Sequence, residues 1–256
     1  MRVLILGGTT EASRLAVALS ERPEIDAILS YAGRTNDLKA QPIPVRIGGF
    51  GGAEGLARYI VDEKIDLLVD ATHPFAARIS QNAAIASTMT CVPLIAFTRA
   101  PWSPVAGDNW IEVADNAAAL AALGQTPRRV FLTIGRLGIG DFRDGVAHHY
   151  LIRAIDPPPP VDLPPNHDLL LARGIFAIDD EVALMRKHAI DVLVTKNSGG
   201  EATYAKIAAA RALGLPVVMV TPPKRPDVTE FHDIADVLAA IAAHGSTASM
   251  GTDRRV

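Results

Sequence analysis

The sequence predicts an α/β protein made of two Rossmann-like halves, each a parallel sheet covered by helices, with a cleft between the halves. First, short apolar runs alternate along the chain with helical patterns. Second, hydrophobic residues make up 49% of the chain and aromatic residues only 5%, which is typical of parallel strands that are buried on both faces. Third, the same alternation restarts halfway along the chain, which predicts a second sheet.

The first half shows the alternation in its clearest form. The apolar run from Met1 to Leu6 stops at a glycine pair and has no cleavage pattern after it, so we interpret it as a strand rather than a secretion signal. The later runs have the length of strands, and the patterns between them have the length of helices. We expect strands near 2–6, 26–30, 66–70 and 93–97, and helices near 11–21, 53–63 and 76–88.

The second half repeats this order. The run 130–134 is followed by a glycine, as the opening run is, and the run 190–194 repeats the pattern of 65–69. A small-residue loop, a helix and an X-Pro strand follow in both places, with the second helix expected at 202–213. We interpret this order as an internal architectural repeat, although unrelated βαβ units also look alike.

The boundary between the halves is expected in the segment 98–112, where Pro101 and Pro104 break every regular pattern. We also expect the active-site cleft there. The predicted division is therefore a first domain over 1–100, a second domain over 101–244 and a flexible tail over 245–256.

Charge and cysteine content exclude several classes of protein. A net charge of -3 and a pI near 6.2 offer no basic surface for nucleic acid. The single cysteine, Cys91, excludes a disulfide framework, and the scattered histidines give no ligand set, so we expect no metal. No apolar run is long enough to span a membrane, and we therefore expect a cytoplasmic protein without a membrane partner.

The segment from Gly7 to Glu11 follows the opening strand and begins a helix, where backbone N–H groups favour a phosphate. Thr9 stands where the G-x-G-x-x-G fingerprint has its second glycine. A helix start that needs Gly for its turn and Thr for its cap would also explain the motif. We expect the turn to bind a dinucleotide phosphate through Gly8, Thr9, Thr10 and Glu11.

The end of the second strand indicates which dinucleotide binds. Sites for NAD carry an acidic residue there, which holds the ribose 2′-hydroxyl, whereas this chain has Ser30 and Arg34. Both side chains suit a 2′-phosphate, so the expected cofactor is NADPH. The missing acid also disfavours S-adenosylmethionine, and the alternative for Arg34 is a solvated surface residue.

Two further segments extend the predicted cofactor site. The glycines from Gly48 to Gly52 would let the backbone approach a flat ligand closely, although a hairpin or bulge would also use them. After the strand at 66–70, Thr72 is expected to cap the next helix, which directs Asp70 and His73 to the ligand-binding edge. We expect cofactor contacts from Gly49, Phe50, Asp70 and Thr72, with His73 either a proton carrier or a structural histidine.

Cationic side chains gather at strand ends in the second half, where they would suit a ligand with several carboxylates. Arginines also decorate loop exits without any such role. The loop from Lys196 to Gly200 exposes backbone donors before a helix that carries Tyr204. A short-chain dehydrogenase would need a lysine four residues after this tyrosine, but position 208 is alanine. The predicted substrate contacts are Arg136, Arg153, Arg173, Lys196, Ser198 and Gly199.

Four segments together resemble the precorrin-6A reductases of cobalamin biosynthesis. They are Leu6 to Ala12, Gly48 to Gly52, Asp70 to Ala76 and Lys196 to Gly200. The resemblance also includes 133–136 and 172–174, and it covers about residues 1–244 in the same order.

This resemblance implies a two-domain reductase that transfers hydride from NADPH to a conjugated double bond of precorrin-6A, at the position joining rings D and A, and so forms precorrin-6B. The protein positions the reactants, and the cofactor supplies the hydride. A proton must then reach the adjacent carbon, for which Lys196, Tyr204, His73 and bound water are all candidates. The implied substrate is a tetrapyrrole polycarboxylate, and neighbouring enzymes of the pathway are candidate partners.

Two other functions stay open from the sequence. A cobalt-precorrin-6A reductase of the anaerobic branch would look similar and would differ in the metallation of its substrate; Ser30 with Arg34 favours the NADPH-using aerobic form. A non-catalytic dinucleotide sensor would bind a partner protein through its second half. Such a sensor would bind NADPH but would not oxidise it with any tetrapyrrole.

Overall fold

The computed structural model describes residues 1–33 and 40–250 and divides into two compact units. The first unit consists of residues 1–99 together with the C-terminal segment from Lys224, and the second unit runs from Ala100 to Pro223. Each unit contains one six-stranded sheet, and all the strand pairs in both sheets are parallel. The predicted α/β class with two Rossmann-like halves is confirmed.

The sheet of the first unit has the strand order β3-β2-β1-β4-β5-β12. This is the Rossmann order 3-2-1-4-5-6, with the last position filled by a strand that the chain reaches only after it has built the second unit. The strands are β1 (Arg2–Leu6), β2 (Asp26–Tyr31), β3 (Val45–Ile47), β4 (Leu67–Asp70), β5 (Leu94–Phe97) and β12 (Thr229–Phe231).

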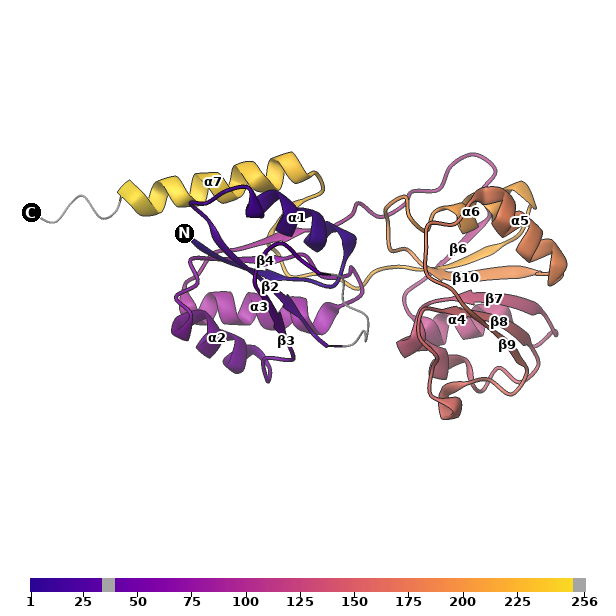
Figure 1. Cartoon of the computed structure of the whole chain (residues 1–256). Helices are drawn as coiled ribbons and strands as arrows, with labels where there is room; N and C mark the ends of the chain where they lie inside the picture. The colour runs from indigo at the N-terminus through magenta and orange to yellow at the C-terminus, as the bar shows by residue number, and fades with distance from the viewer. Residues whose placement is uncertain (34–39, 251–256) are drawn as a thin grey trace, which may run out of the picture. The chain divides into compact units, whose positions relative to one another are not determined.

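Helices cover both faces of this sheet, as Figure 1 shows. Side chains alternate along β1, so Val3 and Ile5 pack with α1 (Thr10–Ser20) and α7 (Ile234–Met250). Leu4 and Leu6 pack on the other face, against α2 (Ala53–Asp62) and α3 (Ala77–Thr90). Burial on both faces explains why the strands are continuous apolar runs.

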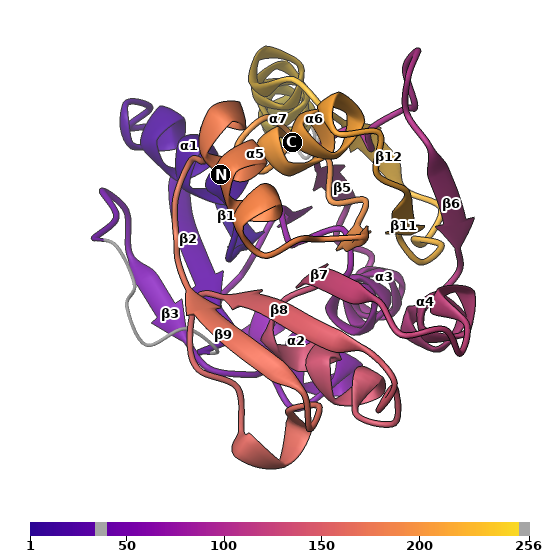
Figure 2. The ribbon, with the colours of Figure 1, turned by 90° about the vertical axis from the view of Figure 1, so that its right-hand side faces the viewer.

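The second sheet has the order β9-β8-β7-β10-β11-β6. Counted from β7, this is the same Rossmann order, and here the last position is filled by β6, which precedes the rest of the sheet in the chain. Figure 2 shows β9 beside β8 at the edge of this sheet. The elements are β6 (Trp110–Val113), α4 (Asn116–Leu123), β7 (Arg129–Thr133), the 3₁₀ helix η1 (Arg136–Phe142), β8 (His149–Ala154), the 3₁₀ helix η2 (Pro160–Asp162), β9 (His167–Leu171), α5 (Ile178–Lys187), β10 (Val192–Lys196), α6 (Ala205–Ala212) and β11 (Val217–Val220).

The internal repeat extends to individual hydrogen bonds. In the first unit the amide of Arg2 donates to Asp66 Oδ2 at 2.7 Å. In the second unit the amide of Arg129 donates to Asp191 Oδ2, also at 2.7 Å. Both aspartates precede the strand at the fourth position of the order, so each ties that strand to the first strand of its sheet. The matching runs 65–69 and 190–194 therefore occupy equivalent places.

The structure corrects the predicted domain boundaries at the C-terminus. Residues beyond Lys224 complete the first unit, because β12 pairs with β5 and because Val237 and Ile241 of α7 lie in the first unit's core. Helix α7 continues to Met250, so the first part of the predicted tail, 245–250, is helical. The rest of that tail lies outside the described residues. Within the described ranges, no helix has both the length and the apolarity that crossing a membrane requires.

Candidate active site

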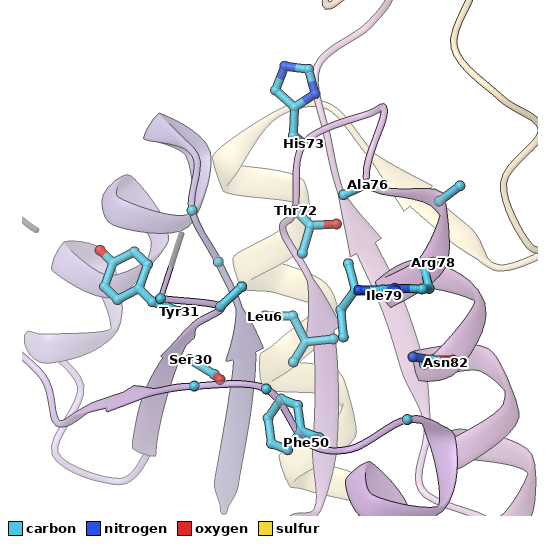
Figure 3. Close-up of a pocket in the computed structure, with 18 of the residues that line it drawn as sticks. Leu6, Ser30, Tyr31, Phe50, Thr72, His73, Ala76, Arg78, Ile79 and Asn82 are labelled. Atoms are coloured by element: carbon cyan, nitrogen blue, oxygen red, sulfur yellow. The ribbon is translucent and has the colours of Figure 1, made fainter. Parts of the chain in front are cut away.

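A cavity of about 830 Å³ opens in the first unit at the carboxyl ends of β1, β2 and β4. This is the edge where open α/β sheets bind their ligands. Figure 3 shows Ser30 and Phe50 in this pocket, together with Arg78, Ile79 and Asn82 from α3. Of the predicted cofactor contacts among the described residues, the pocket is lined by Gly8, Ser30, Gly49, Phe50 and Thr72.

The turn after β1 presents backbone rather than side chains to the pocket. Gly8 lines it with φ at 115°, a conformation that favours glycine. The hydroxyl of Thr9 accepts from the amide of Ala12 at 3.1 Å and donates to the carbonyl of Ala71 at 2.7 Å. Thr9 is therefore the N-cap of α1, and Thr10 begins that helix with an exposed side chain. The amides of Thr10 and Glu11, which precede the capped amide of Ala12, have no acceptor within the helix, and such amides favour an anion.

Glu11 is held by an ion pair rather than directed at a ligand. Its carboxylate lies 3.4 Å from Arg99 Nε, and both side chains are largely buried. A carboxylate in the first turn of α1 would otherwise repel a phosphate there. The ion pair with Arg99 offsets that charge.

Of the two residues predicted to bind a 2′-phosphate, Ser30 and Arg34, the structure describes only the first. Ser30 is buried at the carboxyl end of β2, and Arg34 lies outside the described residues. Arg46 was not among the predicted site residues, yet it stands opposite Ser30 in the pairing of β2 with β3. Its Nη1 lies 3.4 Å from the Ser30 hydroxyl. The signal was weak because β3 has only three residues, and two of them are exposed.

Asp70 has an ion-pair partner of its own and does not line the pocket. One carboxylate oxygen lies 2.6 Å from Arg225 Nη2, and the other accepts from the amide and the hydroxyl of Thr72. Asp70 therefore orients Thr72, which does line the pocket. Thr72 is not the cap of the following helix as predicted, because α3 begins at Ala77 with Ala76 at the N-cap.

His73 lies at the rim of the pocket. Figure 3 shows its ring directed away from Leu6 and Phe50. Its Nδ1 accepts from the amide of Phe75 at 3.2 Å. Arg78 and Asn82 of α3 also line the pocket. They were not predicted, because a helix expected at 76–88 does not by itself reveal which of its faces borders a cavity.

In the second unit, the loop after β10 is fixed by Trp102. The side-chain amide of Asn197 accepts from the Trp102 amide at 2.8 Å and donates to its carbonyl at 2.9 Å. The indole of Trp102 donates to the Gly200 carbonyl at 2.8 Å. Gly199 and Gly200 adopt positive φ values within this loop, and Ser198 is partly exposed.

Lys196 ends β10 at the start of this loop. Burial lowers the pKa of its ammonium group, and the Asp141 carboxylate opposes that effect only in part. Lys196 therefore gives up a proton more readily than an exposed lysine does.

Tyr204 belongs to a cluster that holds α6. Arg211 donates to its hydroxyl and is ion-paired at 2.8 Å with Asp108, while the ring of Trp102 lies 5.8 Å from that of Tyr204. The Tyr204 hydroxyl accepts from Arg211 and keeps its own proton, so the catalytic role of Tyr204 stays a prediction.

Arg153 also has a structural partner rather than an open position. Its guanidinium forms an ion pair with Glu181 and lies 3.9 Å from the centre of the Phe176 ring. Arg153 and Glu181 are only 8% and 2% exposed, so the pair ties β8 to α5. Arg136 is partly buried at the start of η1, and Arg173 is exposed beyond the end of β9. Within residues 1–33 and 40–250, no three His, Cys, Asp or Glu side chains group as metal ligands.

Comparisons with known proteins agree along nearly the whole chain. A family model described as Precorrin-6x reductase CbiJ/CobK matches residues 2–242. A precorrin-6A reductase of Rhodococcus erythropolis is 54% identical over 96% of this chain and 98% of its own length. A solved structure of CobK precorrin-6A reductase is 48% identical, with a TM-score of 0.89 over 96% of this chain and 97% of that one. A cobalt-precorrin-6A reductase of Priestia megaterium is 26% identical over 93% of this chain and 97% of its own.

Proposed function

The chain belongs to the precorrin-6x reductase CbiJ/CobK family, and we propose that it reduces a ring double bond of metal-free precorrin-6A to give precorrin-6B, with NADPH as the reductant. The identity to a precorrin-6A reductase is 54%, against 26% to a cobalt-precorrin-6A reductase. This difference supports the metal-free substrate over the cobalt-containing one.

The observation that carries the proposal is the pocket of the first unit. It borders the helix N-terminus after β1, and a Cβ built on Gly8, Gly48, Gly49, Gly51 or Gly52 would meet no atom within 4 Å beyond the glycine and its two chain neighbours. The backbone there is open to a ligand, and helix N-termini bind phosphates. These residues fit a phosphorylated dinucleotide. When bound, NADPH supplies the hydride.

We assign the macrocycle to the second unit. Lys196 stands at the carboxyl end of β10, and the amide-rich loop that follows is fixed by Trp102. A cation there can bind a substrate carboxylate, and its lowered pKa also suits delivery of a proton to the carbon beside the one that accepts hydride. Arg136, Arg173 and Ser198 supply further polar contacts in this proposal, whereas Arg153 is engaged with Glu181.

The test is an aerobic incubation of the protein with NADPH and metal-free precorrin-6A, followed by absorbance of both cofactor and corrinoid. We expect the two spectra to change together in equal molar amounts, and a slower reaction with NADH. Activity on the cobalt-containing substrate alone would contradict the metal-free proposal. Binding of NADPH without oxidation by any tetrapyrrole would indicate a sensor instead of an enzyme.

A further inference from the structure

The loop from Gly48 to Gly52 is held with three consecutive carbonyls turned toward the protein. Arg46 donates from Nη1 to the Gly48 carbonyl and from Nη2 to the Gly49 carbonyl, the latter at 2.9 Å. The next carbonyl, that of Phe50, lies against Gly55 of α2, where an added Cβ would stand only 1.7 Å from the oxygen. Arg46 and Gly55 therefore determine the orientation of three successive peptide groups.

This orientation directs the amides of the loop to the opposite side. In a trans peptide the N–H points away from the carbonyl of the preceding residue. The amides of Gly49, Phe50 and Gly51 therefore point away from Arg46 and Gly55. All three of these residues line the pocket, while Arg46 and Gly55 do not. Among the described residues these amides donate no hydrogen bond. Successive amides of this kind form an anion-binding concavity.

The charge beside these amides is positive. Within the described part of the chain Arg46 has no carboxylate partner, and its guanidinium lies 3.8 Å from the centre of the Phe50 ring. The same guanidinium contacts the hydroxyl of Ser30, which is buried in the pocket wall. The Ser30 hydroxyl and the three loop residues thus line the pocket near the end of β2, with the Arg46 guanidinium behind them. This is the place where Rossmann folds bind the ribose 2′ position.

We propose that Arg46 is a positioning residue that turns the 48–52 loop into the binding site for the 2′-phosphate of the cofactor. It does so by holding two carbonyls away from the pocket, while Ser30 and the loop amides make the contacts. This inference rests on the proposed use of NADPH and names the residues that select it. It adds Arg46, on β3, to the recognition of the 2′-phosphate for which Ser30 and Arg34 were predicted.

The test compares two small probes that do not depend on catalysis. Adenosine 2′,5′-bisphosphate carries the 2′-phosphate, and adenosine 5′-monophosphate lacks it, so their affinity ratio reports recognition of that group. We expect Arg46→Gln to weaken binding of the bisphosphate by about tenfold or more, while binding of the monophosphate changes little. The reason is that the Gly48 and Gly49 carbonyls lose the charge-assisted bonds that keep the loop amides directed at the 2′-phosphate. Arg46→Lys keeps the charge but cannot hold both carbonyls in the same way, and we expect an intermediate ratio.

Two further variants separate geometry from charge. Gly55→Ala displaces the Phe50 carbonyl without removing any charge, and it should also lower the affinity ratio. Arg58→Gln removes an exposed charge from α2 and should leave the ratio unchanged. Thermal unfolding of each variant identifies any general loss of fold. If Arg46→Gln unfolds at a much lower temperature than the wild type, Arg46→Lys takes its place in the comparison of affinity ratios.

The outcomes are distinguishable. A wild-type protein that binds neither NADPH nor the bisphosphate would contradict the proposed function. Preference for the bisphosphate that persists unchanged in Arg46→Gln would overturn only the role of Arg46. An equal loss of both probes in Arg46→Gln would also overturn it, because a purely structural role affects the whole pocket. A ratio that falls in Arg46→Gln but not in Gly55→Ala would contradict the orientation of the loop.

Discussion

The two units have the same sheet order but carry different groups on their carboxyl edges. In the first unit, the turn after β1 leads into an α-helix of 11 residues. In the second unit, the corresponding turn after β7 leads into a 3₁₀ helix of 7 residues. An α-helix presents several unpaired amides and a dipole at its N-terminus, and this makes a phosphate site. The shared topology therefore does not specify a shared ligand.

The strand at the fourth position of each sheet, β4 or β10, also ends in a different residue. Asp70 at the end of β4 is ion-paired and positions a wall of the pocket through Thr72. Lys196 at the end of β10 carries an ammonium group with a lowered pKa, next to a glycine-rich loop. A carboxylate whose charge is already paired does not repel a phosphorylated cofactor, whereas a cation attracts a ligand with carboxylates. The comparison predicts that cofactor binding and substrate binding separate under mutation.

The largest expected effect concerns Arg153, whose partner Glu181 is buried. Arg153→Met should lower the free energy of unfolding by about 3–5 kcal/mol, because it leaves an uncompensated buried carboxylate. Urea unfolding measures this loss. The double variant Arg153→Met/Glu181→Leu should recover most of it, and Arg143→Met, at an exposed position, should change little. A stable Arg153→Met protein with weakened macrocycle binding would show instead that Arg153 contacts the substrate.

A second prediction tests the turn after β1. Gly8→Val should weaken NADPH by about a hundredfold, or about 2.8 kcal/mol, because a β-branched side chain strains the backbone and fills the phosphate position. Gly124→Val is the matched control, since Gly124 also has a positive φ and open space around its Cα. Both variants should lose similar stability, measured by thermal unfolding. If calorimetric titration shows that Gly8→Val retains wild-type NADPH affinity, the assignment of this turn is wrong.

A third prediction concerns the pH dependence of macrocycle binding. The ammonium of Lys196 binds a carboxylate only while it is protonated, and its pKa is lowered by burial. Affinity should therefore fall as the pH rises through that lowered pKa, at a pH below the range where an ordinary lysine loses its charge. Titrations followed by corrinoid absorbance without NADPH measure this dependence.

Two variants serve as controls for the role of Lys196. Lys196→Arg stays charged and should lose the alkaline fall in affinity. Lys196→Ala should bind about tenfold more weakly at neutral pH without that pH dependence, while NADPH affinity stays the same. A Lys196→Ala protein that loses NADPH but keeps the macrocycle would reverse the assignment of the two units.

The smallest expected effects test the repeat itself. Asp66→Ala and Asp191→Ala each remove a carboxylate that accepts from the first strand of its sheet. Each should lower the free energy of unfolding by about 1 kcal/mol, and neither should affect ligand binding. Equal losses in urea unfolding would show that the two bonds are energetically equivalent. A loss of stability in one variant alone would show that the two hydrogen bonds are equivalent in position but not in energy.

Local sequence patterns were sufficient to predict most of the fold and part of the candidate site. Strands buried on both faces appear as apolar runs, and α1, α2 and α3 begin within one residue of the starts predicted at 11, 53 and 76. The pocket contains Gly8, Ser30, Gly49, Phe50, Thr72 and His73, all of them predicted to act at the cofactor or its reaction. These residues share one property: each lies at the carboxyl end of a strand, in the segment directly after one, or in a glycine-rich loop.

Only the tertiary structure showed which charged side chains are already held in ion pairs. Arg225 reaches Asp70 across 155 residues of sequence, and Arg211 reaches Asp108 across 103 residues. Periodicity describes which face of an element is apolar, and it contains no information about such distant partners. For the same reason the position of β12 could not be predicted from the sequence. This strand fills the last position of the first sheet after the chain has completed the second unit. The sequence by itself thus determined the two sheets and their turns, whereas the ion pairs of Asp70 with Arg225 and of Arg153 with Glu181 are found only in the tertiary structure.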